Sequence, residues 1–438
     1  MLNITPFIMD STSSNAYMAE VQGLLGSVLL PVLVGDVIGY VSDASITVEG
    51  NYDSIAVRYG DGYTVTFTGL YCIKQDDRRL ERSEMKDVAT LHSTVSSFAV
   101  EMFDGTVNAW GDTRSGGDIP MSVQSELKGV VNIFSTLKSF AALREDGSVV
   151  TWGGCEGGDS SSVQVELKGV KTIYSTNESF AALREDGSVV TWGGGEGGDS
   201  SSVQAELKGV KTIYATDGAF AALREDGSVV TWGCKFQGGY SSSVQSELKG
   251  VVSIFSTLNS FAALREDGSV VTWGRSGEGG DSSSVQAELK GVKTIYATDG
   301  AFAALREDGS VVTWGCKFQG GDSSSVQSEL KGIVNIFSTI LSFAALRDDG
   351  SVVTWGMDIQ GGDSSSVQAE LKGVKTIYAT HGAFAAVLKD GGVVSWGIDT
   401  YGGDSRYLQA GLKNREYTLY ATPNAFVAVM NEGGVFIC

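Results

Sequence analysis

The sequence predicts an all-β tandem-repeat protein, a β-propeller of about ten blades arranged as a closed ring or an open spiral. The first observation is that all eight Trp residues recur in one register, with successive gaps of 42, 40, 40, 41, 41, 41 and 41 residues. The second is that each period holds short β-branched segments between Gly-rich corners. A unit of this size buries its apolar face only by stacking on its neighbours. The register is set by Trp110, Trp152, Trp192, Trp232, Trp273, Trp314, Trp355 and Trp396.

Three strands are expected in each unit, and the unit that begins at Val210 illustrates them. Its strands span residues 211–216, 219–224 and 228–232, which are rich in β-branched and apolar residues. The Asp226-Gly227 pair between the last two is a strong hairpin signal. The segment 241–248 is ambiguous. Its apolar spacing, continued to Val251, favours a short helical turn, and a fourth irregular strand is the alternative.

Two weaker copies extend the eight Trp-containing units to ten. We expect an array over residues 46–438, with units ending near residues 67, 110, 152, 192, 232, 273, 314, 355, 396 and 438. Residues 1–45 form an N-terminal segment, of which residues 17–22 are the candidate for completing the last blade. The stretches 205–239 and 287–321 match residue for residue, 82 positions apart. The array therefore grew by duplication of two-blade modules.

Charge and cysteine content narrow the class of partner and the compartment. The chain has 32 Lys+Arg against 52 Asp+Glu, a net charge of −20. Such a surface repels nucleic acid and anionic membrane, and it suits a protein partner with a basic surface.

The five Cys include no Cys-x-x-Cys pair, so reduced thiols are expected. No Lys or Arg precedes Arg58, and the apolar run 23–35 is too short to span a bilayer. We expect a monomer in the cytoplasm or nucleus.

The repeat also resembles that of a known family. The run Asp-Gly-Ser-Val-Val-Thr-Trp-Gly, preceded by Phe-Ala-Ala-Leu, is similar to the regulator-of-chromosome-condensation repeat over roughly residues 46–438. In the near-identity of its repeats, the sequence most resembles long repeat arrays in protists. The resemblance implies a propeller, usually of seven blades. Members are exchange factors for the small GTPase Ran, accessory domains of HECT-type ubiquitin ligases and a bacterial inhibitor of β-lactamases. The family's Gly-Gln-Leu-Gly loop stands here as Gly-Gly-Asp-Ser, for example at residues 197–200.

Catalytic chemistry has few candidate residues. His92 and His381 are the only histidines and are expected in corresponding inter-strand regions of distant units, which offers no Ser-His-Asp arrangement. The repeated Glu-Asp-Gly sequences are interpreted as turns. The Asp of each Gly-Gly-Asp-Ser loop is interpreted as a turn or capping residue, because one carboxylate is a poor calcium site. The sequence therefore predicts no enzyme, no cofactor and no metal.

The residues that differ between units lie in two places, directly after the first strand and directly after Trp-Gly. Antiparallel strands alternate in direction, so both variable loops are expected on one face and the constant turns on the other. Several variable residues are apolar or aromatic, which favours a protein-binding face, although drift in tolerant loops explains the variation equally well. The predicted function is a non-enzymatic protein-interaction scaffold. The alternatives are an enzyme inhibitor, a guanine-nucleotide exchange factor for a small GTPase, or a ubiquitin-ligase-associated module. The predicted partner-binding residues are Leu137, Lys138, Lys235, Phe236, Gln237, Arg275, Lys317, Phe318, Gln319, Ile340, Leu341, Met357, Ile359, His381 and Tyr401.

Overall fold

The structure is a computed structural model. It describes residues 47–50, 54–58, 64–68, 81–154, 157–406, 409, 412, 415–430 and 435–437. The chain divides into two compact units, one formed by residues 87–363 and the other by residues 1–86 together with 364–438. Residues 17–22, the candidate for completing a blade, and Cys438, the last predicted unit end, lie outside the described residues.

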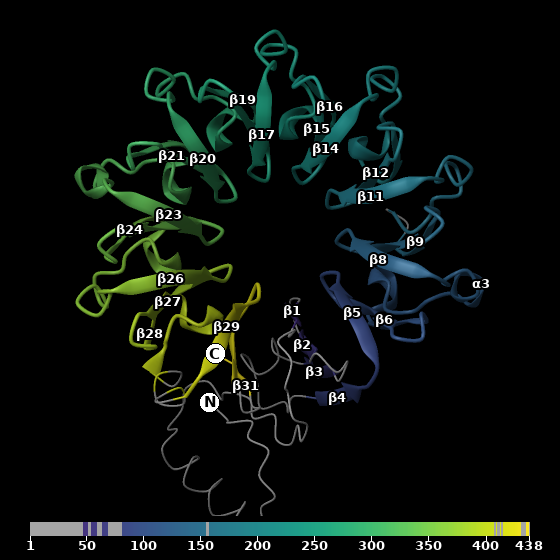
Figure 1. Cartoon of the computed structure of the whole chain (residues 1–438), viewed down its shortest axis with the longest axis horizontal. Helices are drawn as coiled ribbons and strands as arrows, with labels where there is room; N and C mark the ends of the chain where they lie inside the picture. The colour runs from purple at the N-terminus through teal and green to yellow at the C-terminus, as the bar shows by residue number, and fades with distance from the viewer. Residues whose placement is uncertain are drawn as a thin grey trace, which may run out of the picture. The chain divides into compact units, whose positions relative to one another are not determined.

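The unit of residues 87–363 consists of seven three-stranded antiparallel sheets, which follow one another in chain order along an arc (Figure 1). We call these sheets blades 1 to 7. The first strands of successive blades contact each other, as expected for blades that stack radially. In order, the blades are β5 (Val88–Ser93), β6 (Ser97–Met102) and β7 (Val107–Gly111); β8 (Val130–Ser135), β9 (Ser139–Arg144) and β10 (Val149–Gly153); β11 (Val170–Ser175), β12 (Ser179–Arg184) and β13 (Val189–Gly193); β14 (Val210–Ala215), β15 (Ala219–Arg224) and β16 (Val229–Gly233); β17 (Val251–Ser256), β18 (Ser260–Arg265) and β19 (Val270–Gly274); β20 (Val292–Ala297), β21 (Ala301–Arg306) and β22 (Val311–Gly315); β23 (Ile333–Ser338), β24 (Ser342–Arg347) and β25 (Val352–Gly356).

The other unit contains the remaining sheets that the structure describes. One is a four-stranded meander of β1 (Thr47–Gly50), β2 (Ser54–Arg58), β3 (Thr64–Thr68) and β4 (Glu81–Met85). The others repeat the three-stranded pattern in β26 (Val374–Ala379), β27 (Ala383–Leu388) and β28 (Val393–Gly397), and in β29 (Tyr417–Ala421), β30 (Phe426–Met430) and β31 (Val435–Ile437). The protein is therefore an all-β repeat propeller, as the Trp register predicts.

The repeated Trp is the residue that joins one blade to the next. In blade 5, Trp273 stacks on Phe261 with ring centroids 5.2 Å apart, and both side chains are buried. The Trp273 indole Nε1 donates a hydrogen bond of 3.0 Å to the carbonyl of Gly238, which follows blade 4. The same cluster contains Ala221 and Leu223 of blade 4. Each hydrophobic core is therefore shared between two blades, which is why a single unit is not stable by itself.

The segment between the third strand and the next blade is a series of turns. Its hydrogen bonds connect residues three apart, such as Val244 N–H to Ser241 O at 2.9 Å and Glu247 N–H to Val244 O at 2.8 Å. The helical turn predicted from the apolar spacing thus occurs mainly as hydrogen-bonded turns, and it is regular enough to be a helix in some units, such as at α3 (Met121–Gln124) and η6 (Gln327–Glu329). No fourth strand forms in blades 1 to 7, within the part of the chain that the structure describes.

Candidate functional site

The two variable loops of each blade lie against each other. In blade 4, the Cys234 N–H after Trp-Gly donates to the carbonyl of Gly218 after the first strand, at 2.9 Å. The Thr216 Oγ1 donates to the carbonyl of Gln237 at 2.7 Å. Corresponding bonds occur in the other blades, for example from Gly154 N–H to Lys138 O at 2.8 Å. The structure therefore brings together, at one edge of each blade, the two places where the units differ in sequence. We call this edge the loop edge.

The constant turns form the opposite edge of the blade, which we call the turn edge. The Asp226 carboxylate accepts hydrogen bonds from the backbone N–H and the hydroxyl of Ser228, at 3.0 and 2.6 Å. Glu225 N–H donates to Gly209 O at 2.9 Å, which connects the turn to the constant corner before β14. These contacts confirm the turn role predicted for the Glu-Asp-Gly sequences.

The Asp residues of the Gly-Gly-Asp-Ser loops also cap turns. Asp199 accepts from the Ser201 N–H at 2.9 Å, and Asp281 accepts from the Ser283 N–H at 2.9 Å. Within the described residues, no group of three or more His, Cys, Asp and Glu side chains is placed to hold a metal ion.

A chain of backbone hydrogen bonds connects the loop edges of neighbouring blades. Each residue that follows the first strand donates its N–H to the carbonyl of the equivalent residue in the next blade, at 2.9 to 3.2 Å. The series runs through Val95, Leu137, Asn177, Asp217, Leu258, Asp299 and Ile340. Because these bonds use only the backbone, the side chains at these positions vary without loss of the connection.

The predicted binding residues differ in exposure. Phe236, Phe318 and Ile359 are 75%, 70% and 69% exposed. They occupy the middle of the 3-10 helices η3 (Lys235–Gln237), η5 (Lys317–Gln319) and η7 (Asp358–Gln360), which follow blades 4, 6 and 7. Of the other predicted residues, the exposed ones are Leu137, Lys138, Lys235, Arg275 and Lys317, and the half-buried ones are Gln237, Gln319, Ile340, Leu341, Met357, His381 and Tyr401.

Three carboxylates at the loop edge were not among the predicted residues. Asp217 and Asp299 follow the first strands of blades 4 and 6, and Glu278 belongs to η4 (Ser276–Glu278) after blade 5. Burial raises the pKa of Asp299 to about 6, with further contributions from Asp217 and Glu278. Burial also raises the pKa of Asp217. The Asp-Gly pairs at 217 and 299 were visible in the sequence, but their proximity across one intervening blade was not.

The histidines do not occupy corresponding positions. His92 lies inside strand β5, whereas His381 lies in the loop after β26. Burial lowers the pKa of His92 to about 4, and burial also lowers the pKa of His381. The expectation that the two histidines lie in corresponding inter-strand regions was wrong, because His92 fills the place of Tyr378 in its strand.

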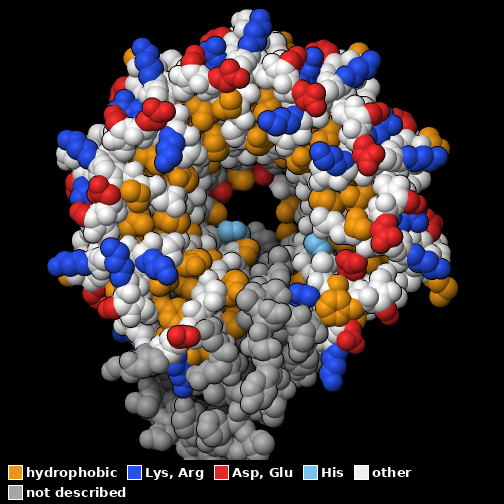
Figure 2. Space-filling view, in the orientation of Figure 1, with side chains coloured by type: hydrophobic (Ala, Val, Ile, Leu, Met, Phe, Trp, Pro, Cys, Tyr) orange, Lys and Arg blue, Asp and Glu red, His pale blue; other side chains and the backbone are white. Residues whose placement is uncertain are grey.

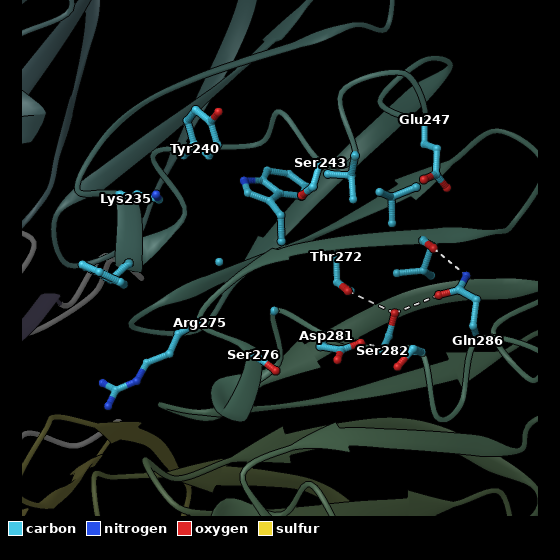
Figure 3. A pocket seen from close by; sticks show the side chains of 18 residues that line it. Lys235, Tyr240, Ser243, Glu247, Thr272, Arg275, Ser276, Asp281, Ser282 and Gln286 are labelled. Carbon is cyan, nitrogen blue, oxygen red and sulfur yellow. Dashed lines mark hydrogen bonds between the residues drawn. The ribbon is translucent and has the colours of Figure 1, made fainter.

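An open groove of about 680 Å³ lies between the loop that follows blade 4 and the third strand of blade 5 (Figure 3). Lys235 and Tyr240 lie on one side of it, and Arg275 and Asp281 come from blade 5. The Thr272 and Ser282 hydroxyls hydrogen bond at 3.0 Å, and Ser282 donates to Gln286 at 2.8 Å. This part of the groove is framework, since the same Thr-Ser-Gln contacts recur in other blades.

Tyr240 is the single difference between two otherwise identical segments. Residues 195–250 and 277–332 are identical except that Tyr240 stands where the second copy has Asp322. The Lys235 ammonium lies 5.4 Å from the centroid of the Tyr240 ring. In the second copy, the Lys317 ammonium forms an ion pair of 3.1 Å with Asp322. One substitution therefore changes the partner of the adjacent lysine from a neutral ring to a carboxylate.

Charged groups of both signs alternate on the surface. Figure 2 shows Lys and Arg side chains interspersed with Asp and Glu side chains along the outer rim of the blades. The ion pairs of Arg144, Arg184, Arg224 and Arg306 with nearby Asp residues span 3.2 to 3.9 Å. The net charge of −20 is thus not presented as one uniformly acidic surface. Among the described residues, no helix has the length and apolar character needed to cross a membrane.

Comparison with known proteins finds solved structures of low sequence identity only. No family model and no curated protein matches the chain. The ectodomain of the receptor kinase ACR4 from Arabidopsis thaliana is 16% identical with a TM-score of 0.35, covering 59% of this chain and 93% of the other. Prp20p from Saccharomyces cerevisiae is 16% identical with a TM-score of 0.38, covering 81% and 95%. Human WBSCR16 is 16% identical with a TM-score of 0.33, covering 64% and 80%. At these values the similarities carry no argument about function.

Proposed function

We propose that this protein is a non-enzymatic scaffold that binds a protein partner through the variable loops at the loop edge of its blades. The observation that carries the proposal is the exposure of Phe236, Phe318 and Ile359 at equivalent positions of three blades. Large apolar side chains on a rigid framework are characteristic of binding surfaces. The backbone bonds between neighbouring loop edges hold these helices in place, so binding requires little ordering of the loops.

The partner in this proposal has a surface of mixed charge with a basic component. A net charge of −20 attracts such a surface over distances longer than single contacts. The interspersed Lys and Arg side chains then contact acidic groups of the same partner. We propose that the protein acts as a monomer, because the repeated blades of one chain already present several equivalent loops.

The test is affinity capture with two matched variants of the full chain. The loop variant carries Phe236→Ala, Phe318→Ala and Ile359→Ala. The control carries Val131→Ala, Val252→Ala and Val334→Ala, which are exposed apolar residues at the second position of strands β8, β17 and β23. We expect a specific partner to bind the natural chain and the control but to be lost from the loop variant.

Two other outcomes would contradict the proposal. Equal capture by all three chains would move binding away from the loop edge. Loss from both variants would indicate a general surface effect. If the captured partner is a single enzyme whose activity falls on binding, the scaffold acts as an inhibitor. If it is a small GTPase, a nucleotide-release assay decides whether the scaffold is an exchange factor.

A further inference from the structure

We propose that the groove between blades 4 and 5 binds an acidic peptide segment of the partner, with a carboxylate held by Lys235 and an apolar side chain against Phe236 and Tyr240. This inference rests on the proposed function and adds the chemistry of the segment that is recognised. Three observations carry it: the charge of the loop after blade 4, the contact of its lysine with Tyr240, and the exposed aromatic side chains beside that lysine.

The loop after blade 4 differs from its equivalents in charge. Eight loops follow a Trp-Gly pair in this chain, and the one from Gly233 to Ser241 is the only one without Asp or Glu. The segments of the other seven loops each contain at least one carboxylate, and Asp322 is the one in the matching copy. A local positive charge on a chain of net charge −20 is a specific feature, because it opposes the overall composition.

Tyr240 keeps the lysine available for an additional anion. A cation over an aromatic ring is attracted by the electrons of the ring face, and its positive charge is not neutralised. The Lys235 ammonium lies 5.4 Å from the Tyr240 ring centroid. In the matching copy, Lys317 is paired with Asp322. Hydrogen bonds from Ser324, followed by Lys317, lower the pKa of Asp322 to about 2, so that carboxylate remains charged and occupies its lysine.

The rest of the groove lining adds a second cation and two acidic groups. Arg275 is exposed, and its guanidinium lies 3.2 Å from Glu278. Glu247 and Asp281 also line the groove. Glu196 accepts a hydrogen bond of 3.3 Å from the Lys235 backbone N–H. This mixture suits a peptide, whose side-chain carboxylate binds the lysine and whose backbone N–H groups face Glu247 and Asp281.

Exposed aromatic residues complete the site. Phe236 is 75% exposed and Tyr240 is 58% exposed, and both line the groove. They offer an apolar surface beside the cation, so a carboxylate next to an aromatic or aliphatic residue meets both features. Single-stranded nucleic acid also uses cations and aromatic rings. The carboxylates of Glu247 and Asp281 favour the peptide instead, because a peptide backbone has N–H groups to donate to them and a phosphate backbone has none.

The experiment measures binding of fluorescein-labelled peptides to the full chain by fluorescence anisotropy. In the probe, a central Phe is flanked by Glu residues, and matched peptides carry Gln or Lys in place of Glu. We expect the Glu peptide to bind the natural chain at least about tenfold more tightly than the Gln peptide. Tyr240→Asp and Lys235→Ala are expected to remove that preference.

The duplicated segment provides the matched controls. Lys317→Ala removes the equivalent lysine, which is already paired, and is expected to change affinity by less than about twofold. Asp322→Tyr should release Lys317 and add a second, weaker site, since Met357 replaces Arg275 there. Thermal unfolding of each variant shows that it remains folded.

Several outcomes would overturn the inference. These are no binding of the Glu peptide, equal binding of all three peptides, a preference for the Lys peptide, or an unchanged preference in Tyr240→Asp. Competition by oligothymidylate that equals competition by unlabelled Glu peptide would assign the groove to nucleic acid instead. If these tests fail while the triple loop variant still loses its partner, the acidic-peptide inference is wrong and the scaffold function stands.

Discussion

The two edges of a blade use the same residue type in opposite environments. In blade 6, Asp308 lies in the constant turn and accepts a hydrogen bond of 2.9 Å from the Ser310 N–H. Hydrogen bonds from Ser310 lower the pKa of Asp308. Asp299 lies at the loop edge of the same blade, where burial raises its pKa to about 6. The turn edge therefore stabilises a charged carboxylate, whereas the loop edge penalises one.

This difference between the two edges explains why the units share the residues of the turn edge and differ in the residues of the loop edge. At the turn edge, each carboxylate is satisfied within its own unit, so every copy works equally well. At the loop edge, side chains contact those of the neighbouring blade, such as Gln237 Nε2, which donates to Asn259 Oδ1 at 2.9 Å. The effect of a change in one loop then depends on the residues of the next loop.

The largest expected effect is on the free energy of unfolding, and it distinguishes a residue of the framework from a residue of the loop edge. Phe261→Ala removes a fully buried ring that stacks on Trp273, and we expect it to cost about 3–5 kcal/mol in the free energy of unfolding. Phe236→Ala truncates a ring that is 75% exposed, and we expect a change within about 0.5 kcal/mol. Urea unfolding followed by Trp fluorescence measures both. Similar losses for the two variants would show that Phe236 is part of the core.

A second comparison lies within a single loop. Gly279 has a φ of +97°, and a Cβ there would lie 2.5 Å from Cδ2 of the buried Phe302. Gly279→Ala is therefore expected to cost about 2–4 kcal/mol, because strain and overpacking add. Gly277 lies two residues earlier with nothing within 4 Å of its Cβ position, and Gly277→Ala is expected to be neutral or slightly stabilising. Equal destabilisation would mean that the whole loop, and not one close approach, is intolerant.

The framework was predictable from the sequence because its signals are local and repeated. Asp226-Gly227 marks a hairpin wherever it occurs, and the register of the eight Trp residues requires one fold for every unit. The packing of these Trp side chains between blades was predictable from the size of the indole ring, because a ring as large as that of Trp273 needs a neighbouring surface to cover it. Antiparallel geometry then placed the two variable loops at one edge, without any knowledge of their contacts.

The contacts within the loop edge could not be predicted in the same way. Lys235 and Lys317 have identical sequence neighbours up to position 239, and only the structure shows that Tyr240 and Asp322 are their side-chain partners. The proximity of Asp299 to Asp217 depends on the stacking of three blades, which no pattern within one unit encodes. The segment before each blade was ambiguous because its turns follow the helical spacing and become a helix in only some of the described units.

A third prediction uses pH to separate the two edges. The raised pKa of Asp299 means that its charged form destabilises the folded protein above about pH 6, and that this penalty disappears as pH falls toward the pKa of the unfolded chain. We therefore expect Asp299→Asn to stabilise the protein by about 1 kcal/mol at pH 7, after allowance for solvent screening, and to have no effect near pH 4.

The control for this prediction is the carboxylate at the turn edge. Asp308 has a lowered pKa, so the stability it contributes is present above the unfolded pKa and is lost as pH falls through the folded value. Asp308→Asn should thus destabilise the protein at pH 7, opposite in sign to Asp299→Asn. Urea unfolding of both variants at the two pH values measures this. The same sign for both variants at pH 7 would remove the contrast between the edges.

The smallest expected effect tests whether residues of neighbouring loops are coupled in their effect on stability. A Cβ at Gly300 would collide with Gln319 Oε1, the end of a flexible side chain that can move aside. Gly300→Ala is therefore expected to cost only about 0.5 kcal/mol, and Gln319→Ala should restore that loss in the double variant. The matching pair is Gly218 and Gln237, where the Cβ would likewise collide with Gln237 Oε1.

The neighbouring blade distinguishes these two pairs. Gln237 is held by its bond to Asn259, whereas the residue equivalent to Asn259 beside Gln319 is Leu341, whose side chain accepts no hydrogen bond. Gly218→Ala should thus cost about 1 kcal/mol, more than Gly300→Ala, because the glutamine that must move gives up a hydrogen bond. Double-mutant cycles for the two pairs measure the difference. Equal coupling energies would show that each loop adapts within its own blade, independently of the next.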